Sequence, residues 1–448
     1  MQQTDFPRTV VVAANPLGTD ACTGVMTRSL FVGWPRERLF QVFFPVGVTY
    51  RPDLEMCQQY RSIRTSGIVR CYDAAQADLT SGIGLRGSFA GFGSRFGLSG
   101  VSLLQKLKGH PRLTHKLRFI QECWYAFSWI GKILERQLRE LQPDIVYAHL
   151  GNYCLTKITC AACERLGIPM FIHVTDDFVT SLYAQMPFST RLQAASDRSF
   201  RHAVAYAHGL AAISPVMAEE YRRRYEKQWS WFTTLIDADA YDPSPRPADG
   251  VIRLVYAGNL ALERWRPLRK LALAIQALRN KQGIDAQLEI YAPPEQINAY
   301  RRELHVPQAS ELRDWLPAEE LPRVFHDADI LVHAESFDPA LANYTQFSFS
   351  TKLSQYMMAG RCILMFGPEE IGSSQMVRIA DAGLRIGTNE SQSLTDALQR
   401  LLVDRSLRER CGQNGRLYAM KWFESQSGRE RFRNVMLETM ERSREKRS

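Results

Sequence analysis

A short stretch in the second half of the chain, FSFSTKLSQYMMAG at residues 347–360, combines a helix start, a cation and a helix stop. Ser350 is expected to cap the helix, with Thr351 and Lys352 in its first turn. The unpaired amides and partial positive charge of a helix N-terminus attract phosphate oxygens, and the Lys352 ammonium adds a full charge there. The stretch therefore predicts a site that suits the diphosphate of a nucleotide sugar.

Two further residues belong to the same predicted helix. Gln355 lies three positions after Lys352 and shares its face of the helix, where the amide could reach a ribose. Gly360 is expected to close the helix in the left-handed conformation. The bare pattern fits a well-capped surface helix equally well, so a functional interpretation needs the rest of the chain.

The composition is that of a folded protein with two or three domains. The 448 residues are 45% hydrophobic and 23% charged, without an apolar run of about 18 residues or a signal-peptide pattern, so we expect a cytoplasmic protein. The nine cysteines are odd in number and scattered along the chain, which argues against a disulfide framework. Cys160 and Cys163 form a CxxC within an expected helix, but no second pair follows at zinc spacing, so no metal is expected.

A net charge of +9 indicates an anionic partner. Residues 103–141 interleave Lys and Arg with Leu, Phe and Trp, which suits a helix on an anionic membrane surface. An ordinary helix pair with a solvated basic face fits the same segment. No recognised nucleic-acid-binding module is present, which argues against a nucleic-acid partner.

Short apolar runs alternate with amphipathic stretches, the pattern of parallel sheets covered by helices. The strands are expected at 10–14, 41–44, 145–149, 170–174 and 210–213, and then at 253–257, 287–291, 330–333, 363–365 and 384–386. A Pro- and Asp-rich segment after Asp237 separates the two sets and is the best linker in the chain. We therefore predict an N-terminal domain over 1–240, a C-terminal domain over 241–420 and a final helical segment over 421–448.

A glycine-rich segment at residues 81–100 contains GxGxxG at Gly82, Gly84 and Gly87. A dinucleotide fingerprint needs a strand before it and a helix after it, and here more glycine follows. We interpret the segment as a loop that could cover a substrate.

The order of the pieces resembles a known family, the glycosyltransferases of the GT-B fold, and is most similar to the retaining group-1 type of bacterial surface polysaccharide assembly. The matching pieces are PLGTDACTGVMTR, QPDIVYAHLG, IPMFIHVTDDF, AAISPVMAEEYRRRY, LVYAGNL and FSFSTKLSQYMMAGRCILMFGP. The resemblance implies two Rossmann-like, doubly wound domains facing a cleft, with the nucleotide sugar held by the second. It implies no metal and no cofactor beyond this donor. It also implies a last helix that crosses back to the first domain.

The resemblance also assigns residues of the second domain. Lys352 would neutralise the diphosphate together with Arg264, or with Arg266 instead, and Gly258 and Asn259 belong to the same donor-binding loop. Glu335 resembles the first acid of the family's paired glutamates, which bonds sugar hydroxyls. Gln355 replaces the second acid, and main-chain groups around Trp315 and Leu316 are candidates to hold the base.

In the first domain the resemblance is looser. Family members often end a strand with a His-Asp pair, and Thr175 and Asp176 stand at those positions, with His173 two residues earlier and Asp177 next. One acid is expected to orient the acceptor hydroxyl, although adjacent acids at a strand end can equally cap a helix. Gly24 would let the first loop approach the donor closely.

The function that these residues imply is transfer of a sugar from a nucleotide sugar to a glycan or lipid-linked acceptor, with retention, at the inner face of the membrane. Two alternatives stay open. A non-hydrolysing sugar-nucleotide epimerase shares the two-domain form, and a catalytically silent scaffold fits the departures at Gln355 and Thr175.

Overall fold

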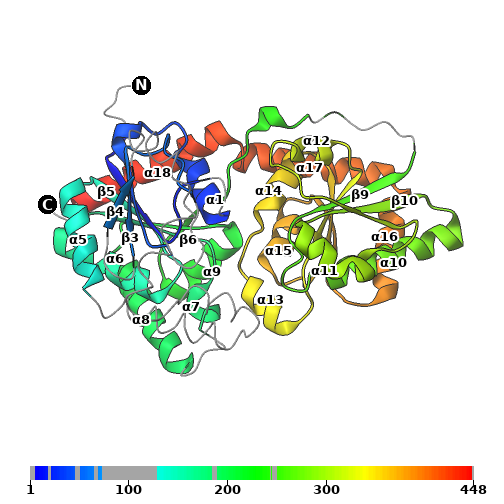
Figure 1. The fold of residues 1–448 in the computed structure, drawn as a ribbon, viewed down its shortest axis with the longest axis horizontal. Coiled ribbons are helices and arrows are strands. Elements are labelled where there is room, and N and C mark those ends of the chain that lie inside the picture. Colours follow the sequence, from blue (N-terminus) through cyan, green and yellow to red (C-terminus); the bar gives the residue numbers. More distant parts are fainter. Residues whose placement is uncertain are drawn as a thin grey trace, which may run out of the picture. The chain divides into compact units, whose positions relative to one another are not determined.

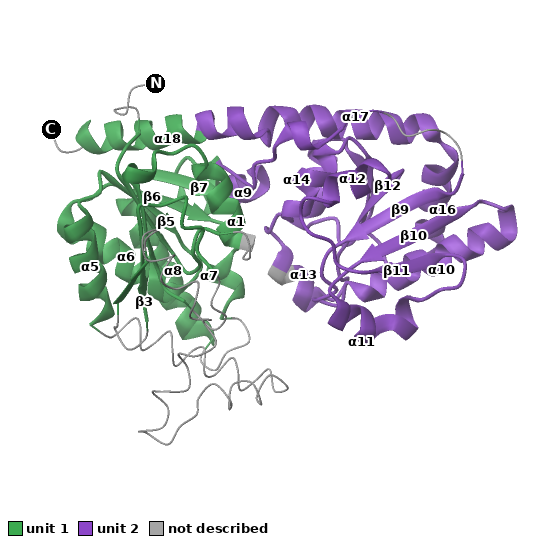
Figure 2. Ribbon diagram, turned by 45° about the horizontal axis from the view of Figure 1, so that its top comes forward, with its two compact units in different colours: residues 1–212, 221–230, 432–448 green, residues 213–220, 231–431 purple. Residues whose placement is uncertain are grey.

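The computed structural model describes residues 6–18, 22–45, 51–64, 69–72, 129–183, 189–242, 244 and 250–445. Their contacts divide into two compact units (Figure 2), unit 1 with residues 1–212, 221–230 and 432–448, and unit 2 with residues 213–220 and 231–431. The main division falls between Ser230 and Trp231, ahead of the Pro- and Asp-rich segment. Each unit has its own sheet and is described separately.

Unit 1, of which Figure 1 labels strands β3 to β6, is built on a sheet in the order β4-β3-β2-β1-β5-β6-β7-β8. All neighbouring strands from β3 to β7 in this order pair in parallel, whereas β3 and β4 pair antiparallel. The strands are β1 (Thr9–Ala13), β2 (Leu39–Phe43), β3 (Gln59–Ile63), β4 (Val69–Tyr72), β5 (Ile145–His149), β6 (Met170–Val174), β7 (Gly209–Ala212) and β8 (Ser230–Trp231).

The central strands of unit 1 are buried along their whole length. Such continuous apolar runs are typical of parallel strands that helices cover on both faces. The helices are α1 (Cys22–Phe31), the short 3-10 turn η2 (Arg36–Arg38), α5 (Ile130–Leu141), α6 (Tyr153–Leu166), α7 (Phe178–Ser181), α8 (Ser189–Tyr206) and the end of α9 (Pro215–Tyr225), whose residues 215–220 belong to unit 2. The last helix, α18 (Ser425–Glu445), ends in unit 1, where Phe432 makes edge-to-face ring contacts with Phe31, Tyr147 and Phe171.

Unit 2 is built on a parallel sheet in the order β11-β10-β9-β12-β13-β14. Its strands are β9 (Ile252–Ala257), β10 (Ala286–Tyr291), β11 (Ser310–Arg313), β12 (Ile330–Ala334), β13 (Cys362–Phe366) and β14 (Gly383–Ile386). The chain winds outward from β9 in one direction and from β12 in the other. Neighbours β9 and β12 therefore form a topological switch point, where open α/β sheets bind ligands at the carboxyl ends of the strands.

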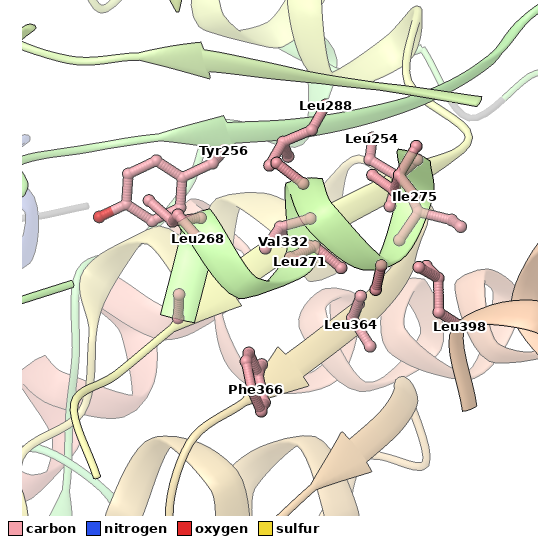
Figure 3. Close-up of a cluster of buried hydrophobic side chains, with 14 of the residues drawn as sticks. Leu254, Tyr256, Leu268, Leu271, Ile275, Leu288, Val332, Leu364, Phe366 and Leu398 are labelled. Carbon is pink, nitrogen blue, oxygen red and sulfur yellow. The ribbon is translucent and has the colours of Figure 1, made fainter. Parts of the chain in front are cut away.

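The helices of unit 2 enclose this sheet. They are the turn η4 (Ala238–Ala240), α10 (Trp265–Gln282), α11 (Pro294–Leu304), α12 (Leu321–His326), α13 (Pro339–Thr345), α14 (Thr351–Met358), α15 (Gly372–Ile379), α16 (Ser391–Val403) and α17 (Arg405–Trp422). Figure 3 shows part of the core, in which Leu268, Leu271 and Ile275 of α10 pack against the strands. This packing fixes α10, and with it the loop that precedes the helix.

These two sheets confirm the expected α/β class, and a strand lies at every predicted position. Sequence reasoning missed β3, β4, β8 and β11. The glycine-rich segment 81–100 and most of the basic segment 103–141 lie outside the described residues. The described end of the basic segment is α5, whose apolar face is buried and whose charges form exposed ion pairs such as Glu135 with Arg139. Among the described helices, none is both long and apolar enough to cross a bilayer.

Candidate functional site

Three charged side chains from separate segments of unit 2 meet at the switch point between β9 and β12. Arg264 ends the loop after β9, Glu335 directly follows β12, and Lys352 lies in the first turn of α14. Because the strands are parallel, both loops leave the same edge of the sheet. The structure thus brings together the three residues that sequence reasoning placed at the donor diphosphate and sugar.

Arg264 and Glu335 form a two-pronged ion pair. Arg264 Nε donates to Glu335 Oε2 at 3.0 Å and Nη2 donates to Oε1 at 2.9 Å, while Nη1 donates to Asn259 Oδ1 at 2.8 Å. The side chains are only 14% and 5% exposed, respectively. A guanidinium has five N–H groups, so two of them have no acceptor among the described residues. Arg264 can bind a further anion without releasing Glu335.

The loop that presents Arg264 has an unusual backbone. Leu262 and Glu263 are both left-handed, with φ of 57° and 58°, although neither is glycine. This conformation costs about 1–2 kcal/mol per residue, and such outliers cluster at functional sites. The tight reversal turns the chain directly into α10.

Glu335 is held ionised. Burial opposes its charge, but hydrogen bonding from His333, together with the charge and hydrogen bonds of Arg264, outweighs burial and lowers the pKa of Glu335 to about 2. His333 Nε2 lies 3.2 Å from Glu335 Oε1. Burial lowers the pKa of His333, so the imidazole is neutral at pH 7 and can donate one N–H to the carboxylate. A buried, ionised carboxylate is suited to accept hydrogen bonds from sugar hydroxyls.

Lys352 lies over the end of β9. Its Nζ is 4.6 Å from the centroid of the Tyr256 ring, a cation–π contact. A Cβ at position 258 would overlap Nζ and crowd the last side-chain carbons. Gly258 therefore provides the space that Lys352 occupies. The adjacent residue Asn259 is fixed through its carbonyl, which accepts from the Tyr256 hydroxyl at 2.6 Å.

The first turn of α14 differs from the expectation in one respect. Ser350 is the N-cap residue, but its side chain makes no capping hydrogen bond. Instead the Ser350 amide donates to Ser373 Oγ at 3.2 Å, and the Ser350 carbonyl accepts from the Leu353 amide at 2.9 Å. The predicted side-chain cap is therefore wrong, although Ser350 and Thr351 do begin the helix. Gly360 follows the helix with φ of 66°, as predicted.

The remaining candidates of unit 2 make no hydrogen bond or ion pair with Arg264 or Glu335 among the described residues. The Gln355 side chain lies beside Tyr241, and burial raises the pKa of Tyr241. A ribose contact at Gln355 stays a prediction. Trp315 and Leu316 follow β11, the strand at the sheet edge, and Trp315 is 53% exposed. Base binding there also stays a prediction.

In unit 1, Asp177 has a structural role that sequence reasoning did not foresee. The carboxylate is buried and accepts from Tyr221 Oη at 2.9 Å, Thr180 Oγ1 at 2.6 Å and Arg224 Nη1 at 2.8 Å. Both oxygens are therefore engaged in joining α7 to α9. We correct the assignment of Asp177 as a candidate for the acceptor hydroxyl, since this carboxylate has little capacity left for a substrate.

His173 is also placed in the core. It lies near the carboxyl end of β6 beside His149 of β5, is fully buried, and its Nδ1 is 2.5 Å from the Tyr147 hydroxyl. A role of His173 at the substrate stays a prediction. Gly24 lies in the first turn of α1 and not in the preceding loop, so the close approach expected of that loop does not involve this residue.

Sequence reasoning missed His149, the last residue of β5. Strands β1 and β5 form the switch point of unit 1, and the His149 ring lies at the carboxyl end of β5, where Nε2 is 3.2 Å from Thr175 Oγ1. Thr175 Oγ1 in turn lies 3.4 Å from Asp176 Oδ2. Burial lowers the pKa of His149 to about 4. The signal in the sequence was a histidine that directly ends an apolar strand before a loop.

Two Rossmann-like, mostly parallel sheets, with a cation-rich cluster at the switch point of the second, are the architecture of the GT-B fold. Residues 252–404 match the family model described as glycosyl transferases group 1. This part of the chain, which lies within unit 2, is a group 1 glycosyl transferase domain, and the expected glycosyltransferase class is confirmed. No curated protein matches the chain in sequence.

Solved structures agree with this fold along the whole chain. HepE of Anabaena in complex with UDP aligns at 12% identity over 97% of this chain and 99% of that chain, with a TM-score of 0.61. The sucrose-phosphate synthase of Thermosynechococcus elongatus aligns at 13% identity over 96% and 97%, with a TM-score of 0.60. The α,α-trehalose 6-phosphate synthase of Burkholderia multivorans aligns at 14% identity over 97% and 96%, with a TM-score of 0.57. At such identities the likeness establishes the fold alone.

Proposed function

We propose that this protein transfers a sugar from a nucleoside-diphosphate sugar to a glycan or lipid-linked glycan, with retention of configuration, in the assembly of a surface polysaccharide. The observation that carries the proposal is the cluster of Arg264, Glu335 and Lys352 at the switch point of the group 1 domain. The cluster combines two cations with one buried carboxylate, so the sum of these three charges is positive and favours an anionic ligand.

Lys352 and the first turn of α14 would hold the diphosphate, because the Ser350 side chain makes no capping bond to this turn and the helix terminus favours negative charge. The remaining N–H groups of Arg264 would add two donors. As the bond to the sugar breaks, charge develops on the leaving diphosphate, and fixed cations stabilise that charge most in the transition state. Glu335 would accept from the hydroxyls of the sugar.

Uridine nucleotides are the donors to test first. HepE was solved with UDP and with UDP-glucose, and the E. coli trehalose-6-phosphate protein with UDP-2-fluoro glucose. Both share the fold of this chain. The main-chain groups around Trp315 and Leu316, which follow β11, are our candidates to contact the base.

On the acceptor side, the linked residues His149, Thr175 and Asp176 are the candidates to orient the attacking hydroxyl. With retention, this hydroxyl attacks from the side that the diphosphate leaves, and the departing phosphate takes the proton. A peripheral position on the membrane would supply lipid-linked acceptors, and the basic segment 103–141 is our candidate for that contact.

The test is a thermal-shift screen of UDP- and GDP-sugars, followed by incubation of the best ligand with and without lipid-linked glycan acceptors. We expect a rise in Tm with one nucleotide sugar, and release of the nucleoside diphosphate that depends on an acceptor. Epimerised nucleotide sugar without an acceptor would instead identify an epimerase. If neither UDP, GDP nor their sugars stabilise the protein, the chain is a silent scaffold and the proposal fails.

A further inference from the structure

Helices α6 and α8 pack against each other in unit 1, as Figures 1 and 2 show. Cys160 and Glu164 are four positions apart on α6 and so lie on the same face of that helix. His202 of α8 faces them across the helix pair. None of these three residues takes part in the proposed sugar transfer.

The three side chains present their ligand atoms at close range. Cys160 Sγ, a carboxylate oxygen of Glu164 and a ring nitrogen of His202 all lie within 4.8 Å of one another. His202 Nε2 is 2.9 Å from Glu164 Oε1, and these two side chains are 63% and 35% exposed. Cys160 is buried. The group thus has a buried thiol at its base and two movable ligands at the surface.

We propose that Cys160, Glu164 and His202 bind a divalent transition metal ion of the zinc class. Thiolate sulfur and imidazole nitrogen select such metals, whereas magnesium and calcium require oxygen ligands. Zinc bonds of about 2.0–2.3 Å place tetrahedral ligands about 3.3–3.8 Å apart. The ligand atoms lie within 4.8 Å of one another, so they must approach by about 1.5 Å at most, which rotation of the exposed Glu164 and His202 side chains allows.

Three protein ligands leave the fourth position to water on the solvent side. On binding, the Cys160 thiol releases its proton to solvent and the sulfur coordinates as thiolate. The bound ion would join α6 to α8 and stabilise unit 1, because the unfolded chain does not hold the three ligands together. Sequence reasoning set aside the CxxC at Cys160 and Cys163 because no second pair followed. Folding supplies the other ligands from the next helical turn and from α8.

The test uses the full-length protein after treatment with a chelator and desalting. Titration with Co²⁺ should give a thiolate-to-cobalt charge-transfer band and visible d–d bands that saturate at one equivalent, and Zn²⁺ should abolish both bands. Zn²⁺ alone should raise Tm by several degrees, whereas Mg²⁺ should leave Tm unchanged. We expect Cys160→Ser and His202→Gln to lose the cobalt bands and the rise in Tm.

Matched controls are Cys71→Ser and His305→Gln, which replace an exposed cysteine and an exposed histidine elsewhere and should keep both signals. Glu164→Gln changes a surface residue, so the variant should fold, and it should weaken Co²⁺ binding at least tenfold. Absence of the charge-transfer band in the wild type, or its persistence in Cys160→Ser, would overturn the proposal. Equal stabilisation of the wild type and His202→Gln by Zn²⁺ would overturn it as well.

Discussion

At the scale of residues, the site depends on a buried charge balance between Arg264 and Glu335. The sequence indicated both residues but not their mutual contact, because they are separated by 71 positions and no local pattern reports such a pair. The same applies to Gln355 and Tyr241. Types and positions of site residues could therefore be predicted, whereas their hydrogen-bond partners required the fold.

The ion pair leads to a stability prediction. Arg264→Ala leaves the Glu335 carboxylate buried without its main partner and should lower the free energy of unfolding by about 3 kcal/mol. Adding Glu335→Gln removes the stranded charge and should recover a large part of that loss. Urea denaturation of the two single variants and the double variant at pH 7 measures the coupling. Additive losses would show that the two side chains do not interact.

A second residue prediction concerns Asp177. Asp177→Asn should lower the free energy of unfolding by about 3 kcal/mol, because it breaks a buried pair with Arg224 and weakens the bond from Tyr221. Nucleotide-sugar binding should persist at temperatures where the variant is folded. Asp176→Asn is the matched control and should cost less than 1 kcal/mol, since this side chain is partly exposed. The reverse ranking of the two variants would contradict the structural role.

At the scale of elements, apolar runs determined what could be predicted. Central strands such as β1 and β13 are buried throughout and give a clear signal. The missed strands β3 (QYRSI) and β11 (SELR) carry polar and charged residues, because they lie toward sheet edges where one face or one side is open to water. Their positions follow from pairing with β2 and β10, which the sequence does not show.

The loop after β9 leads to an element-scale prediction. Gly258→Ala places a methyl group where Lys352 Nζ lies, so the ammonium must move away from the β9 edge. We expect at least tenfold weaker binding of the nucleotide sugar in calorimetry, because a cation is lost from the diphosphate site. Gly151→Ala is the control, because a Cβ there meets no atom within 4 Å. Unchanged affinity in Gly258→Ala would remove Lys352 from the donor site.

At the scale of the whole molecule, both sheets have a topological switch point between two central strands. These strands are β1 and β5 in unit 1, and β9 and β12 in unit 2. Alternation of strands and helices predicted two such sheets. The boundary between the units was harder to predict, since contacts divide the chain at Ser230 and also return residues 432–448 to unit 1. Composition identifies a Pro- and Asp-rich segment as a candidate linker. It does not reveal which unit a later part of the chain, such as residues 432–448, contacts.

Acid stability provides a prediction for the whole molecule. In the unfolded chain His149 binds a proton as the pH falls through 6.5, but in the folded protein only near pH 4. The wild type should therefore lose about 3 kcal/mol through this residue as the pH falls from 6.5 to 4. The stability gap between the wild type and His149→Gln should narrow by that amount over this range in urea titrations. A stability gap between the wild type and His149→Gln that stays constant from pH 6.5 to 4 would mean that His149 is not buried in its neutral form.

Glu335 contributes to stability in a lower pH range. Its folded pKa of about 2 lies below its ordinary value of 4.5, so its contribution to the free energy of unfolding is complete above pH 4.5 and is lost toward pH 2.

The central claim is that Lys352 and its helix start bind the diphosphate of the donor. Isothermal titration of UDP into the wild type, Lys352→Ala and the surface control Lys281→Ala tests it most directly. We expect the wild type and Lys281→Ala to bind with the same Kd, and Lys352→Ala to bind at least tenfold more weakly, a loss of about 1.4 kcal/mol or more. Equal affinity in all three proteins would contradict the claim.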